Sequence, residues 1–117
     1  IYVHIVWATN QRSPMIKKNF QADLYRCIGE IAKNKKWLIL AVGGVCDHIH
    51  ILIKMSPSDA IKDVVRVLKS NSSKFIRDNF DAVFAWQEGY SVFSVDERCL
   101  ENIKNYVLNQ EMRHRKD

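Results

Sequence analysis

The sequence has few cysteines, and their arrangement serves no evident structural purpose. The three cysteines lie far apart, at Cys27, Cys46 and Cys99, and no pair has the C-x-x-C spacing. An odd number of scattered cysteines excludes a disulfide framework and a zinc knuckle. We therefore expect reduced thiols, as in proteins of the cell interior.

Long hydrophobic runs are also missing. The longest run, from Trp37 to Cys46, is interrupted by two glycines, and it is about half as long as a membrane-spanning helix. No signal peptide, internal repeat, low-complexity tract or linker can be recognised. We therefore expect one cytoplasmic domain over residues 1–117, because this length suits one domain and not two.

The composition that is present is that of an ordinary globular protein with a small positive excess. Hydrophobic residues make up 47% of the chain and charged residues 26%, and the formal net charge is +5 at pH 7. This apolar content is sufficient for a core. The positive excess favours an anionic partner such as a nucleic acid, although many soluble domains carry a similar charge.

Apolar periodicity predicts the element order β-α-β-β-α-β-α. We expect strands at 2–9, 37–42, 46–55 and 90–95, and helices at 17–35, 57–79 and 96–113. Gly43-Gly44 is expected to be a turn or bulge, and the segments Ser56–Asp59 and Ser94–Glu97 are expected to cap the second and third helices. The first six elements predict an α+β, ferredoxin-like fold, in which an antiparallel four-stranded sheet carries helices on one face. The last helix is additional.

Two histidines stand two positions apart in the third predicted strand. Alternate side chains of a strand point to the same face, so His48 and His50 share a face, with Cα atoms roughly 6.5 Å apart. Imidazole is a common metal ligand, but two ligands make a poor site, and the pair is equally compatible with two polar residues on a sheet. A third ligand has to come from elsewhere in the fold.

The last predicted helix offers candidates. Tyr106 and Gln110 are four residues apart and share one helix face. A glutamine carbonyl can ligate a hard cation, and a tyrosine hydroxyl can act as a covalent nucleophile. The same pattern has simpler explanations: Tyr106 can be a core residue of an amphipathic helix, and Gln110 a solvated polar residue.

Five segments together resemble one family. "CDHIHILIKM" is similar to the "PDHVHLLI" segment of the HUH-type single-tyrosine transposases of small bacterial insertion sequences, with Cys46 in place of a frequent proline. "NYVLNQE" resembles the nucleophile helix "KYIxNQ" of the same family. "YVHIVWATNQRSP", "KSNSSKFI" and "FAWQEGYSVFSV" resemble its further segments. The matches occur in the family's order and cover nearly the whole chain.

The resemblance implies a mechanism. His48, His50 and Gln110 would bind a divalent ion, Mg²⁺ or Mn²⁺, and Tyr106 would attack the scissile phosphate of single-stranded DNA to form a 5′-phosphotyrosine link. Two imidazoles suit softer metals better, but water and phosphate oxygens would complete a hard shell, so manganese is a sensible choice. Family members recognise DNA hairpins and form homodimers in which the nucleophile helix crosses to the partner. The resemblance therefore implies active sites that take their histidines from one chain and their tyrosine from the other.

Basic residues are candidates for contacts with DNA phosphates. Arg12 lies in the segment that resembles the family's basic turn, and the other candidates are Lys69, Lys74, Arg113 and Arg115. Two alternatives to the transposase remain. One is a non-catalytic, RRM-like nucleic-acid-binding domain, which would need aromatic residues where "HIHILIKM" has none; the other is another HUH endonuclease, such as a replication initiator or relaxase.

Overall fold

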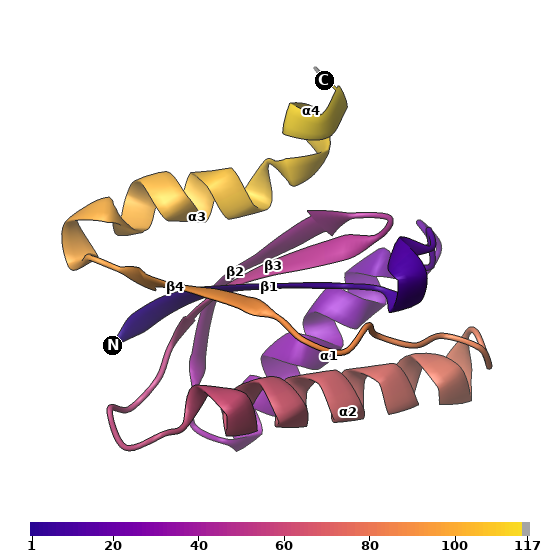
Figure 1. Cartoon of the computed structure of the whole chain (residues 1–117), viewed down its shortest axis with the longest axis horizontal. Helices are drawn as coiled ribbons and strands as arrows, with labels where there is room; N and C mark the ends of the chain where they lie inside the picture. Colours follow the sequence, from indigo (N-terminus) through magenta and orange to yellow (C-terminus); the bar gives the residue numbers. More distant parts are fainter. Residues whose placement is uncertain (116–117) are drawn as a thin grey trace.

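The computed structural model describes residues 1–115, and their side chains as far as Arg113 (Figure 1). Its strands and α-helices follow one another as β1 (Tyr2–Ala8), α1 (Gln21–Asn34), β2 (Leu38–Val45), β3 (His48–Lys54), α2 (Ile61–Asn79), β4 (Ser91–Val95), α3 (Leu100–Leu108) and α4 (Gln110–Arg115). Two short 3-10 helices, η1 (Asn10–Arg12) and η2 (Glu97–Cys99), follow β1 and precede α3. In the part of the chain described, no helix is long and apolar enough to cross a membrane.

The four strands form one antiparallel sheet in the order β2-β3-β1-β4. Helices α1 and α2 pack together on one face of this sheet, and α3 lies across the opposite face, against β2 and β3 (Figure 1). This arrangement is the predicted α+β, ferredoxin-like fold with an additional C-terminal helix. The prediction of the fold class is confirmed.

The register between β1 and β3 gives the sheet two different faces. Odd-numbered residues of both strands, such as Ile5 and Ile51, are fully buried in the main hydrophobic core under α1 and α2. Even-numbered residues point the other way, so Val6 pairs with His50 and Ala8 with His48 on the face that α3 covers. The alternation of the sequence therefore places polar rings in the layer between the sheet and α3.

The first two helices begin later than predicted. Helix α1 begins at Gln21 and not at residue 17, because the preceding segment is tied to the turn between β2 and β3: the Ile16 amide donates to the Cys46 carbonyl (2.9 Å). Helix α2 begins at Ile61, although a cap at Ser56 was expected. The Asp59 carboxylate does accept from the Ser56 amide (3.0 Å), but this bond closes a separate turn before the helix.

The glycine pair is not a turn. Gly43 and Gly44 both lie within β2, and the chain reverses at residues 46–47 instead. Gly43 is required by a close approach of α3, because a Cβ at this position would lie 1.9 Å from the Val107 carbonyl oxygen. A contact distant in sequence, and not the local backbone, explains this glycine.

The predicted final helix is divided. Asn109 separates α3 from α4, with φ −105° and ψ 26°. The expected cap at Ser94 is wrong, since Ser94 belongs to β4. Asp96 caps the 3-10 turn instead, and its side chain accepts from the Arg98 amide (2.8 Å).

Candidate active site

The two histidines of β3 face the same side, as the sequence predicted. Their ring centroids are 5.1 Å apart, and the residues are only 8% (His48) and 6% (His50) exposed. Both rings lie on the sheet face that α3 covers. Two imidazoles at this spacing are close enough to share one ion if their ligating nitrogens point to a common centre.

Asp47 orients the His48 ring. Its Oδ1 lies 2.8 Å from His48 Nδ1, and a carboxylate can only accept, so Nδ1 carries the proton and Nε2 the lone pair. Burial alone would raise the pKa of the Asp47 carboxyl, but the hydrogen bond and electrostatic interaction with His48, together with the positive charge of Arg12, outweigh it and lower the pKa. The carboxyl is therefore ionised at neutral pH.

A third histidine, His4 in the central strand β1, joins the pair. His4 Nε2 lies 2.9 Å from His50 Nδ1, and the two rings stack with centroids 5.1 Å apart. Burial lowers the pKa of His4, so the ring is neutral at pH 7. The sequence alone did not single out His4, because only the register between β1 and β3 brings it to His50. The one feature that could have indicated it is its even position in β1, which places its side chain on the same sheet face as His48 and His50.

Helix α3 brings the tyrosine to these rings. The Tyr106 ring is edge-on to His50, at 5.7 Å between centroids, and to His4, at 6.0 Å. The helix is held in place by Val107, which is fully buried in a small core with Ala41 and Leu52 of the sheet. The phenol ring therefore lies beside His50, one of the two histidines of β3, within one chain.

Gln110 begins α4, one helical turn after Tyr106. It is 2% exposed, and its Nε2 donates to the Tyr106 carbonyl (2.8 Å). Its side-chain oxygen is the atom that could ligate a cation. The structure thus places the four predicted site residues His48, His50, Tyr106 and Gln110 on β3 and on the helices packed against the sheet.

The donor set can hold a divalent ion only with positions left open for oxygen ligands. Among the described residues there is no group of three His, Cys, Asp or Glu side chains that would form a closed site. An ion bound by His48 and His50 would therefore have to complete its shell with an amide oxygen, water or phosphate oxygens. Such an incomplete protein shell suits a site that binds a phosphate substrate, whereas structural zinc sites are closed by four protein ligands.

The predicted DNA-binding residues separate into two groups. Arg12 Nη2 lies 3.4 Å from His48 Nδ1, and the Arg113 guanidinium carbon lies 4.6 Å from the Tyr106 ring centroid, so both arginines border the site. Lys74 belongs to α2, under the opposite face of the sheet, and forms an ion pair with Asp78 (2.6 Å). The side chain of Arg115 lies outside the described residues.

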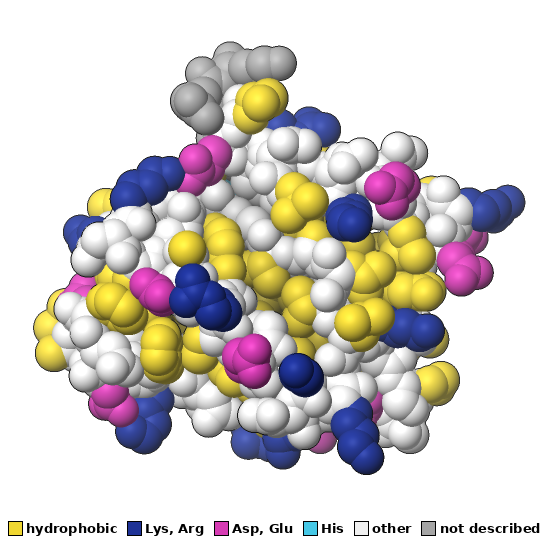
Figure 2. Space-filling view, turned by 180° about the vertical axis from the view of Figure 1, so that it is seen from behind, with side chains coloured by type: hydrophobic (Ala, Val, Ile, Leu, Met, Phe, Trp, Pro, Cys, Tyr) yellow, Lys and Arg dark blue, Asp and Glu magenta, His cyan; other side chains and the backbone are white. Residues whose placement is uncertain are grey.

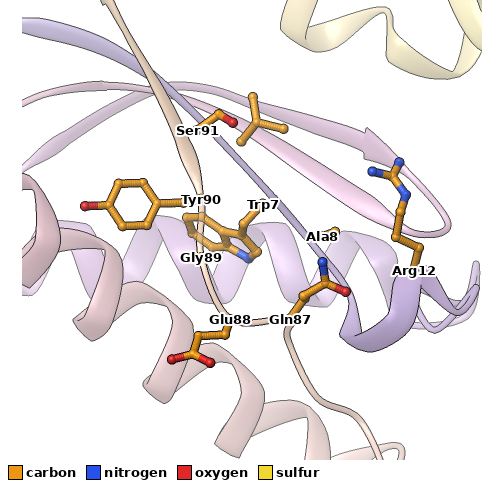
Figure 3. Close-up of a pocket in the computed structure, with 9 residues that line it drawn as sticks. Trp7, Ala8, Arg12, Gln87, Glu88, Gly89, Tyr90 and Ser91 are labelled. Carbon is orange, nitrogen blue, oxygen red and sulfur yellow. The ribbon is translucent and has the colours of Figure 1, made fainter.

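Lys69 binds two backbone carbonyls of a neighbouring loop, which the sequence did not reveal. Its ammonium donates to the backbone carbonyls of Gln87 (2.6 Å) and Gly89 (3.1 Å), and so holds the loop before β4. This loop borders an open pocket of about 220 Å³, with Arg12 at one end and Tyr90 at the other (Figure 3). The role in DNA binding stays a prediction for all five basic residues, Arg12, Lys69, Lys74, Arg113 and Arg115.

A second, larger pocket lies beside the tyrosine. It has a volume of about 570 Å³, and His4, Phe93, Ile103 and Tyr106 are among the residues that line it. On the face shown in Figure 2, apolar side chains gather across the middle, with single basic and acidic side chains among and around them. No patch of one charge sign dominates that face, so the arginines at the histidine site are the more specific sign of an anionic ligand.

Comparison with known proteins identifies the family of the chain. Residues 1–110 match the family model described as "Transposase IS200 like", and the chain belongs to this family. The ISDra2 transposase TnpA of Deinococcus radiodurans is 22% identical over 114 residues, covering 92% of this chain and 81% of its own length. The transposase for insertion sequence element IS200 of Salmonella typhimurium is 28% identical over 118 residues, covering 92% and 74%.

Solved structures give the same result for the fold. A crystal structure of a Deinococcus radiodurans R1 protein described as a transposase superposes with a TM-score of 0.77 and 25% identity, covering 94% of this chain and 90% of its own. A REP-associated tyrosine transposase bound to a REP hairpin superposes with a TM-score of 0.71 and 15% identity, covering 97% and 67%. The chain is thus an IS200-like transposase by sequence and has the fold of such proteins.

Proposed function

We propose that this transposase cuts and rejoins single-stranded DNA, using a divalent ion and a 5′-phosphotyrosine intermediate. The observation that carries the proposal is the position of Tyr106 beside His50, whose ring centroid lies 5.7 Å from that of the phenol and 5.1 Å from that of His48. A nucleophile beside two potential metal ligands is the arrangement that phosphoryl transfer to a side chain needs. The resemblance to single-tyrosine transposases supports the same assignment.

His48 and His50 would hold the ion through their Nε2 atoms, and Gln110 through its side-chain oxygen. The bound ion, Mg²⁺ or Mn²⁺, would neutralise negative charge that develops on the phosphate oxygens. Asp47 keeps the proton of His48 on Nδ1 (2.8 Å) and so preserves the ligating lone pair. Arg12 and Arg113 border the site with positive charge and would position the phosphates on either side of the bond that is cut.

Tyr106 would attack phosphorus through its hydroxyl oxygen. A new Tyr106 O–P bond forms while the bond from phosphorus to the 3′-oxygen breaks; the phenol loses one proton and the released 3′-oxygen gains one. The product is a phosphodiester, so its bond energy is conserved, and a second 3′-hydroxyl can reverse the step on a new strand. No nucleotide triphosphate is needed.

The substrate we propose is DNA whose ends carry hairpins. The REP-associated tyrosine transposase with the same fold is bound to a REP hairpin, which supports this choice. An RRM-like binder is less compatible with the structure, because RRM domains stack bases on an open sheet face, and here α3 covers the face that carries His48 and His50.

A denaturing gel tests the proposal. The protein is incubated with labelled single-stranded oligonucleotides that carry hairpins, with Mn²⁺ or with EDTA. We expect a covalent adduct that needs Mn²⁺ and that disappears in Tyr106→Phe and His48→Ala. It should persist in the matched control Tyr90→Phe, since Tyr90 is an exposed residue that precedes β4. Undiminished cleavage in EDTA would reject the metal site.

We also propose that the protein forms a homodimer through β4. This strand pairs only with β1, so its outer edge is open in the described part of the chain, and Val92 and Phe93 are exposed there. An open, apolar edge strand is a surface for pairing with another copy. Light scattering should give twice the chain mass for the wild type and the single mass for Val92→Lys; a monomeric wild type at micromolar concentration would contradict the dimer.

A further inference from the structure

We propose that His4 is a positioning residue that fixes the tautomer and orientation of His50. The inference rests on the proposed metal site, which needs a lone pair on His50 Nε2. His4 Nε2 and His50 Nδ1 are 2.9 Å apart, and the ring planes are inclined by only 24°. Both residues are buried, at 7% and 6% exposure, so this hydrogen bond is shielded from competing water.

Only one proton can lie between the two nitrogens, and its origin decides what His50 can do. If His50 Nδ1 donates, His4 Nε2 accepts, and the lone pair of His50 lies on Nε2, where a metal ligand needs it. If His4 donates, the proton of neutral His50 lies on Nε2 and blocks coordination. The first arrangement is the one that agrees with the neighbouring ring, because Asp47 already holds the proton of His48 on Nδ1.

The two metal-facing histidines would then be oriented in the same way by two different residues. Asp47 precedes His48 in the chain, whereas His4 reaches His50 from the adjacent strand β1. His4 also contacts the rings of Phe93 (5.7 Å) and Tyr106 (6.0 Å), so its own position is held from the side of β4 and of α3. A ring held on several sides is suited to orient another.

Two substitutions separate orientation from packing. His4→Phe keeps an aromatic ring for the contacts with Phe93 and Tyr106 but removes the nitrogen. His4→Gln places an amide oxygen near the position of Nε2 and can still accept a hydrogen bond. If the hydrogen bond matters, His4→Phe loses function and His4→Gln retains it. If packing matters, His4→Phe retains function and His4→Gln loses it.

The first readout is the tautomer of His50 in the metal-free protein, from long-range ¹H–¹⁵N correlation spectra. We expect the Nδ1-protonated tautomer in the wild type and in His4→Gln, and a mixture of tautomers in His4→Phe. A wild-type His50 protonated on Nε2 would overturn the proposal without the use of any variant.

The second readout is the affinity for Mn²⁺ alone, measured by electron paramagnetic resonance. We expect His4→Phe to lower it by about 10–100-fold, the usual effect of losing an outer-shell partner, and His4→Gln to restore most of it. Wild-type affinity in His4→Phe would overturn the proposal. If the wild type itself bound no Mn²⁺, the metal site of the proposed function would fail, while the tautomer spectra would still decide whether His4 orients His50.

Discussion

The Tyr106 ring lies edge-on to the His50 imidazole of the same chain, with 5.7 Å between the ring centroids. The two residues are far apart in sequence, and they meet because α3 crosses the sheet face that carries the even-numbered residues of β3. The family resemblance implied a tyrosine supplied by a partner chain. The geometry of this chain brings the phenol to its own histidines.

A mixing experiment distinguishes the two arrangements. Tyr106→Phe and His48→Ala are each expected to be inactive, and we expect their mixture to stay inactive, because each intact residue then lies in a chain that lacks the other. If the tyrosine acted on the histidines of a partner, a mixed dimer would contain one complete site. The readout is adduct formation after the two variants are unfolded and refolded together; recovery toward about a quarter of wild-type activity would show a shared site.

Gly43→Ala should displace α3. A Cβ at this position would lie 1.9 Å from the Val107 carbonyl oxygen and 2.9 Å from its carbon, both of which are backbone atoms that cannot rotate away. Overpacking of this kind costs about 1–3 kcal/mol of stability, and a displacement of about 1 Å at the nucleophile can lower the rate about 100-fold. Urea unfolding and the rate of adduct formation measure the two effects.

Gly29→Ala is the matched control for Gly43→Ala. Gly29 lies inside α1, where a Cβ would meet no atom of the surrounding structure within 4 Å. We expect this variant to be more stable by about 0.5–1 kcal/mol, because alanine favours the helix, and to cut DNA at the wild-type rate. An active Gly43→Ala protein with unchanged stability would show that α3 does not depend on this contact.

Arg12 and Lys74 should contribute unequally to DNA binding. Arg12 borders the histidine site, whereas Lys74 lies on α2 and pairs with Asp78. We expect Arg12→Gln to weaken single-stranded DNA binding and to reduce the slope of log K against log salt by about 0.7, the value of one phosphate contact. Lys74→Gln should leave the slope unchanged in the same titration. Equal effects would place DNA on the α2 face as well.

The sequence was sufficient for the fold class and for the strand face and helix on which the candidate site residues lie. Alternation in β1 and β3 and helical spacing in α1 and α2 are local patterns, and they predicted the strand faces on which His48 and His50 lie. Tyr106 and Gln110 were recognised from their helical spacing and from the family resemblance.

What the sequence did not reveal depends on contacts between distant segments. The capping pattern at Ser56 was wrong because the Asp59 carboxylate closes a turn and also accepts from Trp37 Nε1 (3.1 Å), a residue at the start of another element. Gly43 was expected in a turn or bulge because its actual neighbour, Val107, belongs to the last part of the chain. His4 needed the cross-strand register, which no single segment encodes.

The most direct test of the account is to locate the DNA on the protein. The adduct formed with Mn²⁺ is digested with protease and nuclease, and the modified peptide is sequenced by mass spectrometry. We predict a nucleotide joined through its 5′-phosphate to Tyr106. A nucleotide on any other residue, or a cut strand with no residue modified, would contradict the assignment of Tyr106 as the nucleophile.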